Sequence, residues 1–573
     1  MESIIEFRHF GFKYTSQAEP TLYDINLRIN KGEKVLICGP SGCGKSTLSH
    51  CINGLIPQSY SGEATGELLI DGKSFTDYDI FKLSKIVGTV LQDSDAQFIG
   101  LTVGEDIAFA LENDSVSLGE MRSRVSDVAD LVGVQSHLMH APHELSGGLK
   151  QRVSLAGVMV DDVSVLLFDE PLANLDPATG KTAIELIDDI HSSTGKTVII
   201  IEHRLEDVLH RYVDRIILMQ EGRIVADMSP SELLCSDLLA KAGIREPLYI
   251  TALRYAGVAI RPQINPQSID AISLSDAEVA KVRTWYQSVP VASVPDDRPV
   301  ILEAENVDFS YDGKNVALKD INVSIRRGEM MSIVGRNGAG KSTFAKVICG
   351  FERQQNGKIL LNGLDMDGLS IKERAGHIGY VMQNPNQMIS KSMIRDEVGL
   401  GLKLRGKLSQ EDIDAKVDEV LRICGLYEFR NWPISALSYG QKKRVTIASI
   451  LSLDPQIIIL DEPTAGQDFR HYTEIMEFLR QLNERGVTII LITHDMHLML
   501  EYCTRAVVFS DTRKIADKSC EEVLTDQDTI TRANLKETSL ARLSSLCGIA
   551  DETDFIRRFI SVDRSARAEE AEG

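Results

Sequence analysis

Two short segments of the sequence have the residue types that bind phosphate groups. They read GPSGCGKST at 39–47 and GRNGAGKST at 335–343, and each follows a short apolar run, KVLICG or GEMMSIVG. A buried strand, a turn of the form GxxxxGK[ST] and a helix together make a phosphate-binding loop, because backbone N–H groups close around phosphate oxygens and the helix N-terminus favours negative charge. One match arises by chance in about one of fifty such chains. Two matches in the same context indicate two nucleotide sites.

The residues of each loop have distinct expected roles. The lysine of such a loop contacts the β and γ phosphates, and the hydroxyl that follows it ligates Mg²⁺. Lys45 and Lys341 are therefore the predicted phosphate contacts, and Ser46 and Ser342 the predicted Mg²⁺ ligands. The predicted nucleotide-binding residues of the loops are Gly39, Ser41, Gly42, Gly44, Lys45, Ser46 and Thr47, and Gly335, Asn337, Gly338, Gly340, Lys341, Ser342 and Thr343.

A pair of acids ends a hydrophobic strand pattern at two places, VLLFDEP (165–171) and IIILDEP (457–463). Ligands of α/β sheets bind at the carboxyl ends of the strands, where these acids are expected to lie. Asp169 and Asp461 suit the coordination shell of Mg²⁺. Glu170 and Glu462 suit the polarisation of a water that attacks the γ phosphate, so they are the predicted catalytic bases.

The motifs recur in register. VLQDSDAQF (90–98) returns as VMQNPNQMI (381–389) and LSGGLKQR (145–152) returns as LSYGQKKR (437–444), at the spacing of about 290 residues that also separates the loops and the acid pairs. At 573 residues the chain exceeds what one hydrophobic core usually supports. The sequence therefore predicts a duplicated domain.

LSGG and LSYG, each placed before an acid-ending strand, resemble the signature of the ATP-binding cassette (ABC) ATPases. That resemblance implies further site residues. Tyr14 and Tyr311 are expected to stack on adenine, Gln92 and Gln383 to sense Mg²⁺, and Asp176 and Asp468 to contact the other domain of the dimer. His203 and His494 are the expected switch residues on the γ phosphate and are expected to be catalytic, and the expected signature residues are Ser146, Gly148, Ser438 and Gly440. Gln92 and Gln383 are also expected Mg²⁺ ligands.

The resemblance implies an α/β fold with two tandem P-loop NTPase domains, each a mainly parallel sheet with helices plus antiparallel and helical subdomains. The predicted boundaries are 1–240 for the first ABC domain, 241–299 for a proline-containing linker with an appended helical segment, 300–535 for the second ABC domain and 536–573 for a helical appendage and polar tail. LLAKAGIREPLYITALRYAG (238–257) resembles LSSLCGIADETDFIRRFISVD (543–563), which predicts the same helical appendage after each domain.

The family resemblance also implies that the two domains pair head to tail within the chain. Each ATP, with Mg²⁺, is then expected between the phosphate loop of one copy and the signature serine of the other. Two departures from the family pattern are Leu149, where glutamine usually follows LSGG, and Tyr439, where the first signature glycine usually stands. We predict that both sites hydrolyse ATP, at unequal rates.

Charge and hydropathy limit the partners. The net charge of −21 disfavours nucleic acid, because binding to phosphates needs a basic surface. No apolar run reaches the roughly 18 to 20 residues that cross a bilayer, and the N-terminus does not have the order of a signal peptide. The nine cysteines form no CxxC pair, which favours reduced thiols over disulfides or metal ligands. The expected location is the cytoplasmic face of the cell membrane, as a peripheral protein.

The segment QDSDAQFIGLTVGEDIAFALEN (92–113) is similar to that of energy-coupling factor (ECF) ATPases, and the chain looks most like their double-domain hydroxymethylpyrimidine/thiamine-type members. This similarity implies an integral membrane T component, a substrate-binding S component and uptake of a vitamin or related micronutrient. Phe98, Ile99, Met388 and Ile389 are candidate docking residues, with packing against the helical subdomain as the alternative. A ribosome-binding tandem ABC ATPase, or the ATPase of another ABC transporter, remains the alternative function. The sequence does not name the substrate.

Overall fold

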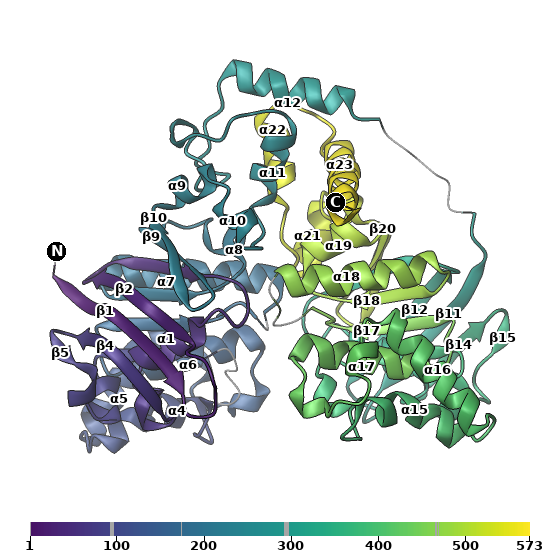
Figure 1. Cartoon of the computed structure of the whole chain (residues 1–573), viewed down its shortest axis with the longest axis horizontal. Coiled ribbons are helices and arrows are strands. Elements are labelled where there is room, and N and C mark those ends of the chain that lie inside the picture. Colours follow the sequence, from purple (N-terminus) through teal and green to yellow (C-terminus); the bar gives the residue numbers. More distant parts are fainter. Residues whose placement is uncertain are drawn as a thin grey trace. The chain divides into compact units, whose positions relative to one another are not determined.

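The computed structural model describes residues 2–91, 97–173, 175–290, 297–464, 467 and 469–572, with the side chains of 568–572 excepted. The chain forms two compact units, of which the second begins at Tyr286. Each unit contains one copy of the repeat, and the two have the same architecture (Figure 1).

The first unit contains two sheets. One is antiparallel in the order β2-β1-β4-β5, and the other has the order β10-β9-β3-β8-β7-β6, with every neighbouring pair parallel except β9 and β10. Their bounds are β1 Ser3–Tyr14, β2 Leu22–Asn30, β3 Lys34–Cys38, β4 Gly62–Ile70, β5 Lys73–Ser74, β6 Val87–Val90, β7 Val165–Asp169, β8 Thr197–Ile201, β9 Arg215–Gln220 and β10 Arg223–Met228.

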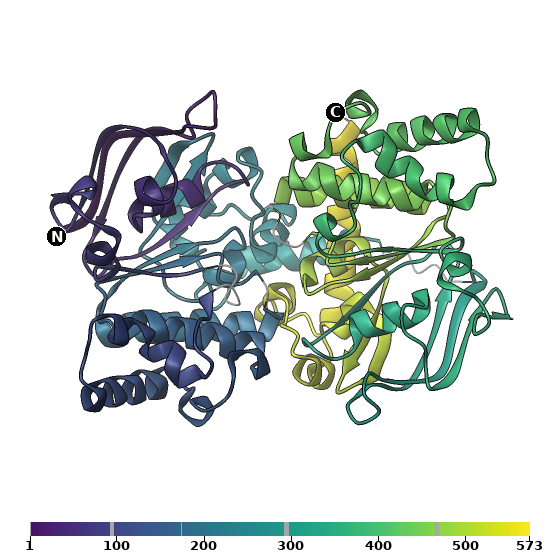
Figure 2. The same ribbon diagram turned by 90° about the horizontal axis from the view of Figure 1, so that it is seen from below.

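Helices cover the parallel sheet and extend beyond it. The antiparallel sheet, in purple, and the helical region α4–α6, in blue, lie on opposite sides of this unit (Figure 2). The helices are α1 Lys45–Ile52, α2 Leu55–Gln58, α3 Ile80–Ser84, α4 Val103–Asn113, α5 Leu118–Leu131, α6 Gly147–Met159, α7 Pro177–Thr194, α8 Leu205–Val208, α9 Pro230–Cys235, α10 Leu238–Lys241, α11 Leu248–Tyr255 and α12 Asp276–Ser288, the last of which crosses the boundary between the units.

The second unit repeats both sheets, in the orders β12-β11-β14-β15 and β16-β17-β18-β13-β19-β20. Its strands are β11 Val300–Ser310, β12 Val316–Arg326, β13 Met330–Gly335, β14 Asn356–Leu361, β15 Leu364–Asp365, β16 Ile378–Val381, β17 Ile457–Asp461, β18 Thr488–Ile492, β19 Arg505–Ser510 and β20 Arg513–Ser519. Its helices are α13 Lys341–Cys349, α14 Ile371–Arg374, α15 Ile394–Arg405, α16 Gln410–Ile423, α17 Tyr439–Leu451, α18 Phe469–Glu484, α19 Met496–Tyr502, α20 Cys520–Val523, α21 Gln527–Ala533, α22 Ser539–Leu546 and α23 Glu552–Glu572.

The central parallel strands are the apolar runs of the sequence. β3, β8 and β18 are buried at every position, as expected for strands covered on both faces. β7 and β17 are buried except at their last residue, the acid Asp169 or Asp461. The strands predicted before the phosphate loops and through the acid pairs are therefore confirmed, and the acids emerge at the carboxyl edge of each sheet.

The predicted appendages share a helix–glycine–helix pattern. Gly243 lies between α10 and α11, and Gly548 lies between α22 and α23. Their φ angles of 67° and 63° lie in the left-handed region, where glycine carries little strain. The second appendage differs in length, because α23 runs for 21 residues. Among the described residues, no helix is both long and apolar enough to cross a membrane.

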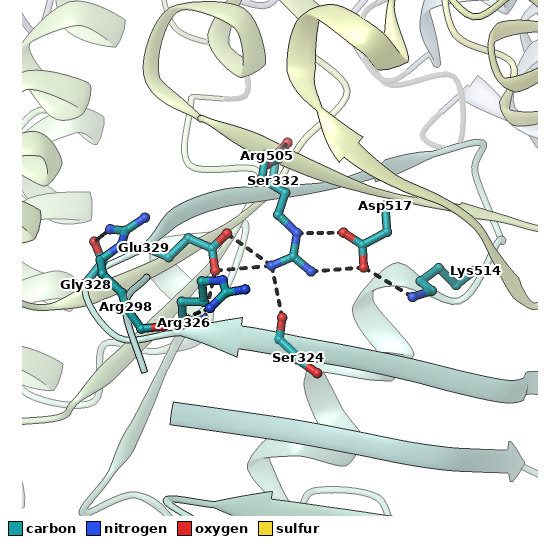
Figure 3. A network of polar contacts seen from close by, with 9 residues as sticks. All are labelled: Arg298, Ser324, Arg326, Gly328, Glu329, Ser332, Arg505, Lys514 and Asp517. Atoms are coloured by element: carbon teal, nitrogen blue, oxygen red, sulfur yellow. Dashed lines mark hydrogen bonds and ion pairs between the residues drawn. The ribbon is translucent and has the colours of Figure 1, made fainter. Parts of the chain in front are cut away.

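A buried charge cluster in the second unit joins its two sheets (Figure 3). The guanidinium of Arg505 on β19 donates to both Asp517 oxygens, at 2.6 and 2.9 Å, to Glu329 at 3.1 Å and to the carbonyl of Ser324 at 2.9 Å. The Glu329 side chain is 1% exposed. Because a buried carboxylate is costly unless paired, Arg505 is a structural requirement of this unit.

The first unit has the same cluster. Arg215 on β9 donates to Glu33 at 2.5 Å, to both Asp227 oxygens at 2.7 Å and to the carbonyl of Arg28 at 2.7 Å. The side chains of Glu33 and Asp227 are more exposed, at 11% and 29%. The duplication thus preserves a polar brace that the sequence motifs do not mark.

Candidate functional site

In each unit, the predicted site residues follow the carboxyl ends of adjacent parallel strands. The first phosphate loop joins β3 to α1, Asp169 ends β7, and His203 follows β8. Because β3 pairs with β8 and β8 with β7, three segments far apart in sequence converge at one edge of the sheet. The second unit repeats this arrangement with β13, β18 and β17.

The geometry of the phosphate loops requires glycine at two positions in each copy. Gly44 and Gly340 have φ angles of 102°, a conformation that other residues adopt only under strain. A Cβ at Gly39 would lie 2.3 Å from the carbonyl oxygen of Met219, and one at Gly335 would lie 2.0 Å from that of Phe509. These glycines let each loop lie directly against the neighbouring strand.

The two loop lysines adopt the same conformation. Nζ of Lys45 donates to the carbonyls of Gly39 at 2.7 Å and Pro40 at 2.9 Å, and Nζ of Lys341 donates to those of Gly335 at 2.8 Å and Arg336 at 2.9 Å. Both side chains lie along their own loops, with the lysines 7% and 6% exposed. The cation is thus held inside the loop whose N–H groups suit phosphate oxygens.

The predicted adenine-stacking tyrosines lie beside these loops. The hydroxyl of Tyr14 is 3.1 Å from Oγ1 of Thr47, and that of Tyr311 is 3.2 Å from Oγ1 of Thr343. Tyr311 is 56% exposed, so its ring has a free face. The structure therefore brings each tyrosine to the phosphate loop of its own copy.

Both catalytic-base candidates have unusual backbones. Glu170 and Glu462 have φ angles of 48° and 46°, in the left-handed region, where bulky residues are uncommon. Their amides donate to the carbonyls of Ile201 and Ile492, the last residues of β8 and β18, at 2.9 Å in each case. Such outliers cluster at functional sites, where the surrounding structure holds the backbone in place.

The electrostatics of the acid pairs reflect their burial. Burial and, to a smaller extent, the adjacent Glu170 carboxylate raise the pKa of Asp169 to about 6. Burial also raises the pKa of Glu170, against the opposing charge of His203. The pKa of Glu462 is raised to about 8, chiefly by burial.

The second Mg²⁺ candidate has a partner that sequence patterns did not single out. The hydroxyl of Tyr380, on β16, donates to Oδ2 of Asp461 at 2.8 Å. The first copy has Thr89 at the same strand position, and its buried hydroxyl has no hydrogen-bond partner among the described residues. The two sites therefore differ in what orients the aspartate.

The switch histidines face different carboxylates. Nδ1 of His203 lies 3.3 Å from Glu202 and 3.9 Å from Glu170. Nε2 of His494 lies 3.5 Å from Glu462. Glu202 is fully buried, accepts hydrogen bonds from the amides of His203 and Arg204, and was missed from sequence. The signal that could have identified it is its position directly after the apolar strand β8.

The signature residues begin helices α6 and α17. Ser438 forms a capping box, in which its hydroxyl accepts from the Gln441 amide at 3.3 Å and the Gln441 side chain accepts from the Ser438 amide at 3.0 Å. Ser146 makes no side-chain cap hydrogen bond, and Leu149, which stands where Gln441 does, has no side-chain acceptor for the Ser146 amide. A Cβ at Gly148 would lie 2.5 Å from Cγ2 of Thr179, so α6 approaches α7 closely there.

Leu149→Gln is expected to complete a capping box at Ser146 and to raise the free energy of unfolding of the first unit by about 1 kcal/mol. Thermal unfolding of the full chain measures the effect, with Leu149→Ala as the control that removes the leucine without adding a cap. An equal stability change in the two variants would contradict the capping explanation.

Other predicted residues have less defined surroundings. Gln92 and Asp468 lie outside the described residues. Gln383 is exposed and follows β16. Asp176 is buried and caps α7 by accepting from the Thr179 amide at 3.0 Å. Gly440 is the second residue of α17, and among the described residues a Cβ there would approach His471, at 3.9 Å.

The residues present fit ATP with Mg²⁺. A Cβ at Gly42 or Gly338 would meet none of the described residues within 4 Å, so each loop has open space at this position. Ser46 and Ser342 offer hydroxyl oxygens and Asp169 offers a carboxylate, which are donors that Mg²⁺ prefers. Oε1 of Glu462 is buried without a hydrogen-bond partner among the described residues. Such an oxygen is available to a water molecule or a ligand.

Comparison with known proteins gives the family. The model described as ABC transporter matches residues 22–173 and 318–465, just over half of the chain. A protein of Clostridium perfringens, named an ABC transporter ATP-binding protein, is 58% identical over 99% of both chains. The chain belongs to the ABC transporter family.

Other ABC relatives agree. An Enterococcus faecalis protein of the same name is 56% identical, over 98% of this chain and 99% of that protein. Residues 236–309 match a second model, described as an ATP-binding cassette cobalt transporter. The solved structure of CbiO1 from Clostridium perfringens, described as part of the ABC transporter complex CbiONQ, is 35% identical, with a TM-score of 0.39, over 44% of this chain and 99% of that one. This chain is an ATP-binding and ATP-hydrolysing subunit of an ABC transporter.

Proposed function

We propose that this subunit powers an importer of the energy-coupling factor type. The importer takes up a micronutrient, which is either a vitamin or a transition-metal ion, through separate membrane subunits. The observation that carries the proposal is the match of residues 236–309 to a model described as an ATP-binding cassette cobalt transporter. The resemblance of segment 92–113 to ECF ATPases supports it independently. The subunit then lies on the cytoplasmic face of the membrane, bound to a T component and, through it, to an S component.

We propose that each copy contributes one set of catalytic residues. Lys45 and Lys341 bind the β and γ phosphates, and Glu170 and Glu462 accept a proton from the attacking water. His203 and His494 contact the γ phosphate. Mg²⁺, held by Ser46 and Asp169 or by Ser342 and Asp461, would neutralise charge on the phosphates. The assignment is supported by the convergence of these residues at the carboxyl ends of the parallel strands in each copy.

The pairing of the copies follows the family pattern in this proposal. Ser438 and Gly440 would close the first site, and Ser146 and Gly148 the second, so that ATP holds the copies together and hydrolysis releases them. Fusion in one chain raises the effective concentration of each copy for the other.

An exposed apolar surface on the first unit is the proposed docking site for the T component. Ile99, Leu101 and Met139 are 66%, 82% and 85% exposed. The segment that contains Ile99 and Leu101 is held to the segment that contains Met139 by two backbone hydrogen bonds. The amide of Val103 donates to the carbonyl of His140 at 2.9 Å, and the amide of Gly104 donates to that of Leu138 at 2.8 Å. Exposed apolar clusters mark sites of protein association.

The other predicted docking residues are less accessible. Phe98, Met388 and Ile389 are half-buried, and Sδ of Met388 accepts a hydrogen bond from the amide of Met382 at 3.2 Å. Of the four residues predicted from sequence, Ile99 is therefore the best candidate for contact with a membrane partner.

The double variant Ile99→Glu/Leu101→Glu is expected to lower recovery of the membrane partner by about 10-fold or more, because it places two charges in an apolar contact. Affinity purification of the tagged chain from detergent-solubilised membranes measures recovery. Leu364→Glu is the control, since Leu364 is 74% exposed on the β14–β15 hairpin. Ribosomes in place of an integral membrane protein would contradict the importer assignment.

A further inference from the structure

Helix α17 of the second copy carries a buried cation that is absent from the first copy. Lys443 is 1% exposed, and its position corresponds to Gln151 on α6. Burial of an ammonium is costly unless its donors are satisfied. Its Nζ donates to the carbonyls of Gln383 at 2.7 Å, Met382 at 3.3 Å and Glu462 at 3.3 Å. Three donors thus meet three acceptors, all of them on the main chain.

These acceptors belong to two functional segments. Met382 and Gln383 follow β16, and Glu462 follows β17. A single ammonium therefore spans the residue predicted to sense Mg²⁺ and the residue predicted to activate water. Because it bonds to main-chain oxygens, it fixes the backbones of the two segments relative to each other and leaves both side chains free for the nucleotide.

Tyr439 reinforces the same connection. Residues four apart on a helix lie on one face, and the hydroxyl of Tyr439 donates to the Gln383 carbonyl at 3.2 Å. That oxygen accepts from both Tyr439 and Lys443. Tyr439, which departs from the family signature, therefore makes a specific hydrogen bond to the Gln383 segment within the second unit.

The first copy is built differently at both positions. Gly147 stands where Tyr439 does and has no side chain to donate. Gln151 donates to the carbonyl of Pro171 at 2.6 Å. Among the described residues, the Gln151 amide reaches the segment after the acid pair with one neutral hydrogen bond, whereas Lys443 makes charge-assisted bonds, which are about twice as strong.

We propose that Lys443, supported by Tyr439, is a positioning residue of the second ATP site, which sets the distance between Gln383 and Glu462 and thereby the rate of hydrolysis there. This inference rests on the proposed catalytic roles of Gln383 and Glu462. It predicts an effect on the chemical step rather than on nucleotide binding, because the hydrogen bonds that Lys443 makes with these residues are to main-chain oxygens and leave their side chains free.

The test uses the full-length chain carrying Glu170→Gln, in which the second site supplies the remaining ATPase activity. Lys443→Gln installs the residue of the first copy and is expected to lower kcat by about 10-fold, with KM for Mg·ATP changed less than about twofold. Tyr439→Phe removes one hydroxyl and is expected to lower kcat by about two- to fivefold. Lys442→Gln is the matched control, because it removes the neighbouring positive charge.

The proposal would be overturned if the kcat of Lys443→Gln were within about twofold of that of its parent. It would also be overturned if Lys442→Gln lowered kcat as much as Lys443→Gln does. A loss of kcat accompanied by an equal rise in KM would overturn it too. The proposed function is checked separately with Glu170→Gln/Glu462→Gln. If that chain retains the activity of its parent, the assignment of Glu462 fails, whatever the effect of Lys443.

Discussion

The chain carrying both Glu170→Gln and Glu462→Gln is expected to lose ATPase activity by at least about 100-fold, because both proposed proton acceptors for the attacking water are then neutral amides. Each glutamate directly follows a buried strand at the carboxyl edge of its sheet and is held at positive φ. Glutamine preserves the size of the side chain, so the loss reports on chemistry rather than on folding. Phosphate release at saturating Mg·ATP measures it.

The single variants separate the two copies. Each is expected to retain part of the activity, in unequal amounts, since Glu202 lies beside His203 only in the first copy and Tyr380 contacts Asp461 only in the second. Glu63→Gln, at an exposed position on β4, is the control. Full activity in either single variant would contradict the claim that both copies hydrolyse ATP.

Arg505→Met is expected to lower the free energy of unfolding of the second unit by about 3 to 5 kcal/mol, because it leaves the buried carboxylate of Glu329 without its cation. Asp517 loses two hydrogen bonds, of 2.6 and 2.9 Å, at the same time. Chemical denaturation followed by intrinsic fluorescence measures the change. The catalytic residues are not touched, so the folded fraction should still bind ATP.

Two variants serve as controls for that measurement. Arg215→Met, in the first unit, is expected to cost less, because Glu33 and Asp227 are more exposed to water than Glu329. Arg513→Met, at an exposed position on β20, is expected to be nearly neutral. If Arg505→Met were no more destabilising than Arg513→Met, the cluster in Figure 3 would not be a structural brace.

Much of the fold and the site could be predicted from the sequence, because the chemistry of phosphate binding constrains residue type at fixed spacing. The strands before the phosphate loops and the acids at the ends of β7 and β17 follow local patterns. Tyr14 and Tyr311, which lie beside the loops, were expected from the family resemblance instead. The duplication strengthened each prediction, since a chance match does not recur in register.

The remaining features depend on contacts between distant segments. Tyr380 and Asp461 are 81 residues apart, and Lys443 and Gln383 are 60 apart. The placement of β3 between β8 and β9 decides which segments meet, and chain order alone does not reveal it. Arg505 and Glu329 likewise meet only after the sheets have formed. No spacing rule marks such pairs, so the differences between the two sites emerged only from the structure.

The number of ATP molecules bound per chain tests the central claim most directly. Equilibrium dialysis of the Glu170→Gln/Glu462→Gln chain with labelled ATP and Mg²⁺ is expected to give two bound nucleotides per chain, one for each ABC match. Adding Lys45→Ala or Lys341→Ala to that chain should leave one. A single bound nucleotide before either lysine is changed would contradict the account of two functional ATP sites.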